Sequence, residues 1–323
     1  AFQHVVTASE NVGPAMSASG GRSRSESTGE SVVPIARVIA EPAVLSAKVS
    51  DAVHGLEAAG LVVHAAEPLR GLEEVLQIAA DGDAAAMRSV LERLFPDADL
   101  LVSTSEPSVP KVFVSDMDST MIQAECIDEL ADFAGLKDQI AGITERAMQG
   151  ELDFAEALTE RVRLLGGLGE GAIAQCLAER VPAMPGAGAL VATLKEHGCF
   201  TVLVTGGFHQ FADPVADQLG FERVVANRLA VEHGALTGGL VGGIVDSAVK
   251  EAVLREEMGL RGGASLATGD GANDIPMLRA ATHGIAYHAK PKAKEAAHGY
   301  VAAGDLTSVL LLLGIPRPDW VQG

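Results

Sequence analysis

The stretch Val112-Phe-Val-Ser-Asp-Met-Asp-Ser-Thr120 combines a short apolar run with two carboxylates that follow it directly. Residues 111–115 are typical of a buried strand, and Asp116 and Asp118 come immediately after it. In an open α/β sheet, ligands bind beyond the carboxyl ends of the strands, so acids at this position face a ligand rather than the core. The sequence therefore predicts a functional site at this strand end.

A second apolar run ends in the same way, at Gly269-Asp-Gly-Ala-Asn-Asp274. Strand 264–268 precedes it, so Asp270 and Asp274 are expected at the same edge of the sheet as Asp116. Carboxylate oxygens suit a hard divalent cation, and Mg²⁺ is usually held by one or two carboxylates with water and substrate phosphate. The pattern therefore predicts a magnesium site. Capping of the following helix is the alternative role for Asp270 and Asp274.

From residue 111 onward, strands alternate with helices, which predicts a doubly wound parallel sheet. An insertion of four helical patterns at about 122–185 predicts a cap, and Gly-rich residues 231–240 predict a β hairpin. The cap helices are expected at 127–133, 138–148, 154–165 and 171–179. The remaining core elements are expected as helix 187–197, strand 199–204, helix 209–219, strand 224–226, helix 248–258, strand 264–268, helix 274–281, strand 284–287, helix 291–297 and helix 305–313.

Residues 33–104 carry a different pattern, of a small α+β domain. The predicted elements are strand 34–40, helix 44–59, strand 61–65, strand 72–79, helix 83–94 and strand 99–102. Their order, βαββαβ, is that of a ferredoxin-like domain. Two prolines make residues 105–110 a linker. Residues 1–32 lack periodicity and are predicted to be a disordered tail, while Glu26 and Glu30 and the missing apolar stretch argue against a targeting peptide.

Composition narrows the classes of partner. The 323 residues carry a formal net charge of −19, which argues against nucleic acid or an anionic membrane surface as partner, because both require basic patches. The apolar runs fall short of the roughly 20 residues that span a bilayer. The three cysteines form no zinc or redox motif and indicate reduced thiols, which predicts a cytoplasmic location.

Four motifs occur in the order found in the haloacid dehalogenase superfamily: Asp116-Met-Asp-Ser-Thr120, Thr205-Gly-Gly207, Lys250 and Gly269–Asp274. Over about residues 110–318 the chain resembles phosphatases of that superfamily, and within it the phosphoserine phosphatase family. The N-terminal domain resembles the ACT domain, a small-ligand or dimerisation module. No ligand signature is visible in it, so packing or dimerisation is the expected role and a homodimer is a candidate assembly.

The resemblance implies roles for the acids. Asp116 would be the nucleophile that forms an aspartyl-phosphate, and also a ligand of Mg²⁺. Asp118 would act as general acid and base, with its backbone carbonyl as a further metal ligand. Asp270 would supply the metal carboxylate of the second strand. Asp274 would hold metal-bound water or steady Lys250, which supplies the counter-charge for the phosphoryl oxygens.

The remaining site residues are expected to bind the substrate. Thr205 would end a strand and offer its hydroxyl, while Gly206 and Gly207 aim backbone N–H groups at a phosphate where a helix starts. Asn273 resembles a phosphate or substrate contact.

Three residues of the cap fall at the positions where the phosphoserine phosphatase family reads its substrate. Glu125 would bind the ammonium group and Arg161 the carboxylate of an amino acid, with Phe154 beside them. Charges on a solvated helix face are the alternative reading of Glu125 and Arg161.

The resemblance thus implies Mg²⁺-dependent hydrolysis of O-phospho-L-serine to L-serine and phosphate, the last step of serine biosynthesis. Two alternatives remain open at this point. The first alternative is phosphoryl transfer from phosphoserine to another alcohol such as homoserine, because an aspartyl-phosphate does not dictate the acceptor. The other is a non-catalytic amino-acid sensor that uses the N-terminal module, against which the intact acidic motifs and Lys250 argue.

Overall fold

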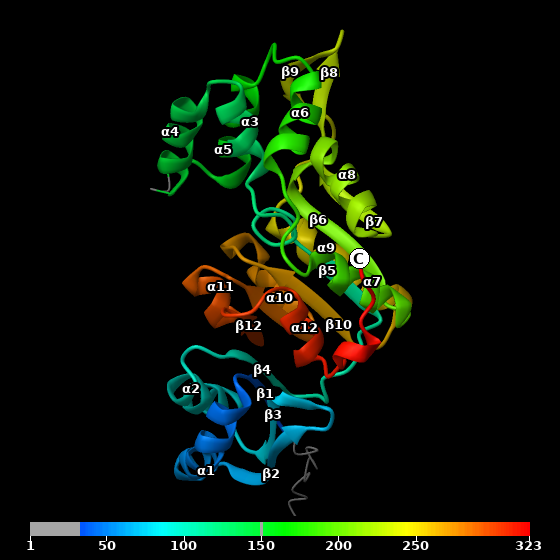
Figure 1. Cartoon of the computed structure of the whole chain (residues 1–323). Coiled ribbons are helices and arrows are strands. Elements are labelled where there is room, and N and C mark those ends of the chain that lie inside the picture. Colours follow the sequence, from blue (N-terminus) through cyan, green and yellow to red (C-terminus); the bar gives the residue numbers. More distant parts are fainter. Residues whose placement is uncertain (1–32, 149–150) are drawn as a thin grey trace, which may run out of the picture. The chain divides into compact units, whose positions relative to one another are not determined.

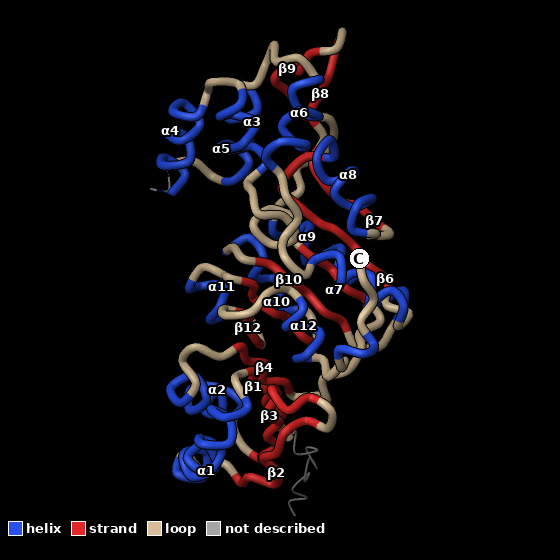
Figure 2. The backbone as a smooth tube through the Cα atoms, viewed as in Figure 1, coloured by secondary structure: helices blue, strands red, loops and turns tan. Residues whose placement is uncertain are grey.

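The structure is a computed structural model that describes residues 33–148 and 151–323. The disordered tail predicted for residues 1–32 lies outside the described residues. Within the described part, most strands belong to one ten-stranded sheet, and two form a separate hairpin (Figures 1 and 2). None of the helices in this part is long and apolar enough to cross a membrane.

The N-terminal segment has the predicted order of elements. They are β1 (Ile35–Ile39), α1 (Pro42–Ala58), β2 (Val62–Leu69), β3 (Leu72–Asp81), α2 (Ala84–Leu94) and β4 (Asp99–Ser103). The strands pair antiparallel in the order β2-β3-β1-β4. Helix α2 begins where the side chain of Asp83 accepts a hydrogen bond from the N–H of Ala86, and it buries one apolar stripe against the sheet. The kinship with ACT domains stays a prediction.

The core strands are parallel to one another, as predicted. They are β5 (Val112–Ser115), β6 (Phe200–Phe208), β7 (Arg223–Asn227), β10 (Ser265–Gly269), β11 (His283–Tyr287) and β12 (Gly299–Val301). Their order is β12-β11-β10-β5-β6-β7. In this register Ser115 lies opposite both Thr268 of β10 and Leu203 of β6. The carboxyl ends of the three central strands therefore meet at one edge of the sheet.

Helices cover both faces of the core sheet. They are α7 (Ala187–Glu196), α8 (His209–Leu219), α9 (Ser247–Arg261), α10 (Ile275–Ala280), α11 (Pro291–Ala296) and α12 (Thr307–Leu312). Strand β5 shows the alternation that results: Phe113 belongs to the apolar cluster that includes residues of α7, α8 and α12, whereas Val112 and Val114 belong to the cluster that includes residues of α9, α10 and α11. The predicted doubly wound arrangement is confirmed.

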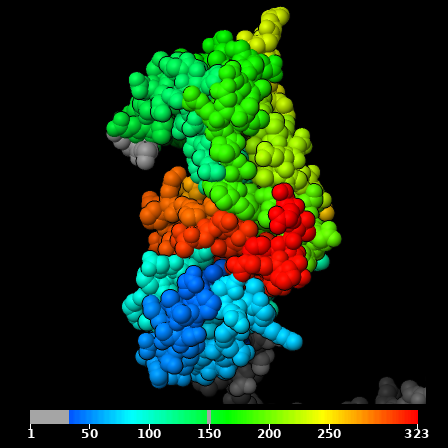
Figure 3. All heavy atoms as spheres, viewed as in Figure 1, coloured from blue at the N-terminus to red at the C-terminus, as the bar shows by residue number. Residues whose placement is uncertain are grey.

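In its described residues, the insertion between β5 and α7 forms four helices, close to the predicted bounds: α3 (Cys126–Phe133), α4 (Lys137–Met148), α5 (Phe154–Leu164) and α6 (Gly171–Arg180). The predicted hairpin consists of β8 (Leu229–Glu232) and β9 (Ala235–Leu240). It bonds to the loop between α5 and α6, where Leu236 exchanges backbone hydrogen bonds with Gly167 and Leu168. On the face seen in Figure 3, the surface is hollowed between the cap helices (green) and the segment that carries α11 (orange).

Two features differ from the sequence prediction. Strand β6 does not end at Thr205 but runs to Phe208, where it pairs with Asn227 after a break in register that begins at Val204. Strand β12 was not predicted. It pairs antiparallel with β4, with Gly299 opposite Leu101, and so joins the N-terminal strands to the core sheet. The division of the chain at residues 105–110 therefore stays a prediction.

Candidate active site

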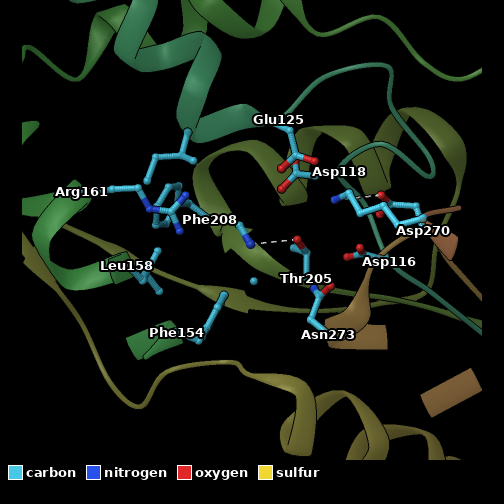
Figure 4. Close-up of a pocket in the computed structure, with 14 residues that line it drawn as sticks. Asp116, Asp118, Glu125, Phe154, Leu158, Arg161, Thr205, Phe208, Asp270 and Asn273 are labelled. Atoms are coloured by element: carbon cyan, nitrogen blue, oxygen red, sulfur yellow. Dashed lines mark hydrogen bonds and ion pairs between the residues drawn. The ribbon is translucent and has the colours of Figure 1, made fainter. Parts of the chain in front are cut away.

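A cavity of about 130 Å³ lies between the carboxyl ends of the central strands and the cap (Figure 4). It brings together most of the predicted site residues. Its lining consists of Asp116, Asp118, Glu125, Ile127, Phe154, Leu158, Arg161, Thr205, Gly206, Gly207, Phe208, Asp270, Asn273 and Lys290. Core and cap thus both contribute side chains to one pocket.

Lys250 and Asp274 do not line the cavity but lie buried beside it. The ammonium group of Lys250 contacts Oδ1 of Asp116 at 2.6 Å and Oδ1 of Asp274 at 2.7 Å. Burial works against a charged lysine, yet Asp116 and Asp274 together raise the pKa of Lys250 above its usual value. Burial and the nearby Asp274 raise the pKa of Asp116, whereas Lys250 acts to lower it. The lysine therefore stays a cation and is the group that favours an ionised Asp116.

Local structure sets these three groups in place. The side chain of Asp246 accepts a hydrogen bond from the N–H of Val249 and starts α9, whose first turn carries Lys250. Gly269 allows the approach of Asp274, because a Cβ atom at Gly269 would lie 2.5 Å from Cγ of Asp274. A Cβ at Gly271 would collide with Asn273 in the same way. Gly269 therefore permits the close approach of Asp274, and Gly271 that of Asn273.

Carboxylate oxygens of Asp116, Asp270 and Asp274 all lie within 4.8 Å of one another. Burial raises the pKa of Asp270, while the nearby Lys290 acts in the opposite direction. A cluster of buried acidic oxygens fits a hard divalent cation such as Mg²⁺. Asp274 thus reaches the cluster directly as well as bonding to Lys250, so both of its expected roles remain open.

The Asp118 carboxylate has another partner. Its Oδ1 accepts a hydrogen bond from the backbone N–H of Cys126, the first residue of α3, at 3.1 Å. Burial, followed by the proximity of Glu125, raises the pKa of Asp118 to about 7. A carboxyl group with such a pKa exchanges a proton readily at neutral pH, as a general acid and base must.

The last residues of β6, after Val204, differ in detail from the expectation. The N–H of Gly207 donates to Oγ1 of Thr205 at 2.8 Å, so it is engaged within this segment rather than aimed at a phosphate. This bond uses Thr205 as an acceptor and leaves its hydroxyl proton available for a ligand oxygen. The helix that follows begins at His209, beyond both glycines. Of the three expected donors, the Thr205 hydroxyl and the N–H of Gly206 therefore remain for a phosphate.

The cap closes the other side of the pocket. Arg161 projects from α5 into it, and burial lowers the pKa of Arg161, whereas the surrounding acids act in the opposite direction. Phe154, set at the start of α5 by a capping box between Asp153 and Glu156, presses its ring against Gly206. A Cβ atom at Gly206 would lie 3.1 Å from Cζ of Phe154. Glu125 stands at the opposite wall, next to Asp118 (Figure 4).

Four lining residues were not predicted. Ile127, Leu158 and Phe208 provide apolar walls, and Lys290 places an ammonium group 3.6 Å from Oδ2 of Asp270. Leu158 lies one helical turn from Phe154, so the periodicity of α5 contained a signal for it. Lys290 had no comparable signal, because its approach depends on the backbone bond from its N–H to the carbonyl of Asp270.

The sequence and the fold of this chain are similar to those of known proteins. Residues 113–279 match the family of haloacid dehalogenase-like hydrolases. A phosphoserine phosphatase of Albidiferax ferrireducens is 44% identical over 62% of this chain and 89% of its own length. One from Streptomyces coelicolor is 42% identical over 65% of this chain but only 52% of its own length. The solved structure of a probable phosphoserine phosphatase from Vibrio cholerae is 32% identical, with a TM-score of 0.69 over 89% of this chain and 88% of that one.

Proposed function

The chain belongs to the haloacid dehalogenase-like hydrolase family, and from that premise we propose that it hydrolyses O-phospho-L-serine to L-serine and phosphate. The observation that carries this proposal is the composition of the pocket. Two acids of the core, Asp116 and Asp118, share it with one acid and one base of the cap, Glu125 and Arg161. Relatives named phosphoserine phosphatases, at about 40% identity, support the same substrate.

In the first step, a carboxylate oxygen of Asp116 attacks phosphorus and the bond to the seryl oxygen breaks, which gives an aspartyl-phosphate. Lys250 keeps Asp116 ionised and offers a positive charge at the reacting centre. Asp118 gives its proton to the seryl oxygen as it leaves. In the second step Asp118 takes a proton from the attacking water, which releases phosphate and restores Asp116.

Residues of the cap bind the carboxylate and ammonium groups of the substrate. The guanidinium group of Arg161 pairs with the substrate carboxylate, and the carboxylate of Glu125 with its ammonium group. Phe154, Leu158 and Ile127 exclude water from the pocket. Thr205, Gly206 and Asn273 bind the phosphoryl oxygens.

Asp116 and Asp270 would hold Mg²⁺, together with the backbone carbonyl of Asp118 and with Asp274 nearby. When bound, the cation neutralises charge on the phosphoryl oxygens.

We infer that this reaction is the last step of serine biosynthesis, because its product is L-serine. Three free and buried cysteines support a cytoplasmic location.

The direct test incubates the purified chain with a panel of phosphomonoesters, with and without Mg²⁺, and follows free phosphate. We expect release from O-phosphoserine well above release from phosphoethanolamine and from simple alkyl phosphates. A parallel reaction with homoserine as acceptor separates transfer from hydrolysis. Release from none of the esters, or equal release from all, would contradict the proposal.

A further inference from the structure

Ser119 lies in the turn between Asp118 of the core and Glu125 of the cap, and it has no role in the proposed chemistry. Its φ angle is 54°, in the left-handed region that serine adopts only at an energetic cost. A glycine would meet this conformation without strain. A contact of the serine side chain, which glycine lacks, would offset this strain.

That side chain has one specific partner. Oγ of Ser119 donates to Oε1 of Glu125 at 2.8 Å, while the backbone N–H of Ser119 donates to the carbonyl of Ala124. Glu125 occupies the N-cap position of α3 yet makes no capping bond with its own carboxylate. The N–H of Cys126 is bonded by Asp118 instead. The Glu125 carboxylate is thus held by Ser119 and not by its own helix.

The neighbouring charge explains why such a tether matters. The side chains of Asp118 and Glu125 lie next to each other (Figure 4), and two like charges placed side by side repel. Glu125 is exposed, so its side chain could turn toward solvent at little cost. A hydrogen bond from a residue fixed in a tight turn opposes that rotation.

From these contacts we propose that Ser119 is a positioning residue for substrate recognition, which holds Glu125 in the orientation that accepts the ammonium group of the substrate. The inference rests on the proposed function, because Glu125 is the ammonium acceptor only if the substrate is an amino-acid phosphate. Ser119 itself does not line the pocket. Its loss is therefore expected to weaken binding of the ammonium group and to leave the chemical step in place.

The test compares two substrates that differ only in the ammonium group, O-phosphoserine and 3-phosphonooxypropanoate. For Ser119→Ala we expect kcat/KM on phosphoserine to fall about 3- to 10-fold, chiefly through KM, with no comparable change on the second ester. Ser119→Gly should behave alike, because it also loses the hydroxyl but relieves the backbone strain. In a Glu125→Gln background, Ser119→Ala should add no further loss.

The matched control is Gln123→Ala in the same turn. Gln123 tethers the turn through a bond from Nε2 to the carbonyl of Ala183 and does not contact Glu125. This variant should leave both substrates unaffected. If the Ser119 variants lose equally on both substrates, or lose on neither, the inference about Ser119 is overturned. The proposed function still stands in that case, provided that the wild-type enzyme prefers phosphoserine. A wild-type enzyme that does not prefer phosphoserine over its des-amino analogue would overturn both.

Discussion

The ammonium group of Lys250 lies 2.6 Å from a carboxylate oxygen of Asp116, and both side chains are almost completely buried. Buried charges are costly unless they are paired, and here the pair has a third member in Asp274. Two acids share one lysine, so this cluster carries an excess of negative charge before any cation arrives. A bound cation would reduce that excess and stabilise the folded chain.

The proposed nucleophile can be tested by Asp116→Asn. We expect loss of turnover with an unchanged fold, because the amide has nearly the shape of the acid but is a poor nucleophile. Phosphate release and circular dichroism should be measured on the same preparation. A variant that folds normally and keeps a tenth of the wild-type rate would show that another residue attacks.

Removal of the lysine should cost stability as well as activity. In Lys250→Met, Asp116 and Asp274 face each other without a cation, and we expect the free energy of unfolding to fall by about 3 kcal/mol. Urea denaturation measures this quantity. The double variant Lys250→Met with Asp274→Asn should lose less than the sum of the two single changes. Additive losses would mean that the two groups are not coupled.

The role of Arg161 in substrate recognition can be tested with Arg163, two residues away, as the control. Arg161→Ala should lower kcat/KM for phosphoserine roughly ten- to a hundredfold, because a hydrogen-bonded charge pair with the substrate carboxylate is lost. O-phosphoethanolamine, which lacks that carboxylate, should be little affected. Arg163→Ala, which removes an exposed guanidinium outside the pocket, should leave both substrates unchanged. Similar losses for Arg161→Ala on both substrates would assign Arg161 to the phosphate or to the cap.

Metal removal should abolish activity. A chelator is expected to stop phosphate release, Mg²⁺ to restore it and Ca²⁺ to inhibit, because calcium takes more ligands at longer distances. Mg²⁺ should also raise the melting temperature of the wild type more than that of Asp270→Asn, which gives a readout independent of turnover. Full activity in the presence of chelator would rule out the proposed cation.

Stability should fall in mild acid because of His283. This side chain is fully buried on β11, where Nδ1 lies 3.3 Å from Oγ of Ser103, and burial, with His298 and Arg37 nearby, lowers the pKa of His283 to about 4. In the unfolded chain the imidazole binds a proton below about pH 6.5, whereas the folded chain resists protonation down to about pH 4. The contribution of His283 is therefore complete above pH 6.5 and is lost as the pH falls toward 4.

The loss from this one group should reach about 2 to 3 kcal/mol. Unfolding free energies of the wild type and of His283→Gln, measured by denaturant titration at pH 7 and at pH 4.5, check the prediction. The variant should show the smaller difference between the two pH values, and a pH dependence equal to that of the wild type would contradict it.

Much of this architecture follows from local patterns. The cap helices lie within a few residues of their predicted bounds, because apolar positions recur at the helical period in each. The placement of Asp116 and Asp270 at neighbouring strand ends followed from a general property of parallel sheets. Glu125 and Arg161 could be placed in the pocket only through resemblance to a family, since a charge on a helix is usually solvated.

The features that the sequence did not predict depend on contacts between residues far apart in the chain. Strand β12 is three residues long and has no periodicity of its own; it exists because β4, some 200 positions earlier in the chain, supplies its partner. The backbone of β4 approaches so closely that a Cβ at Gly299 would lie 2.4 Å from the carbonyl oxygen of Leu100. Lys290 reaches the pocket through a backbone bond to Asp270, and no pattern around Lys290 indicates it.

The sequence by itself determined which chemical groups stand at the strand ends and which segments are helix or strand, because both depend on residues close together in the chain. Tertiary structure alone decided how those groups share their hydrogen bonds. Lys250 pairs with both Asp116 and Asp274, and Oγ of Ser115 lies 2.8 Å from Oγ1 of Thr268. Each of these polar atoms bonds the partner that packing brings within about 3 Å, and those partners come from distant parts of the chain.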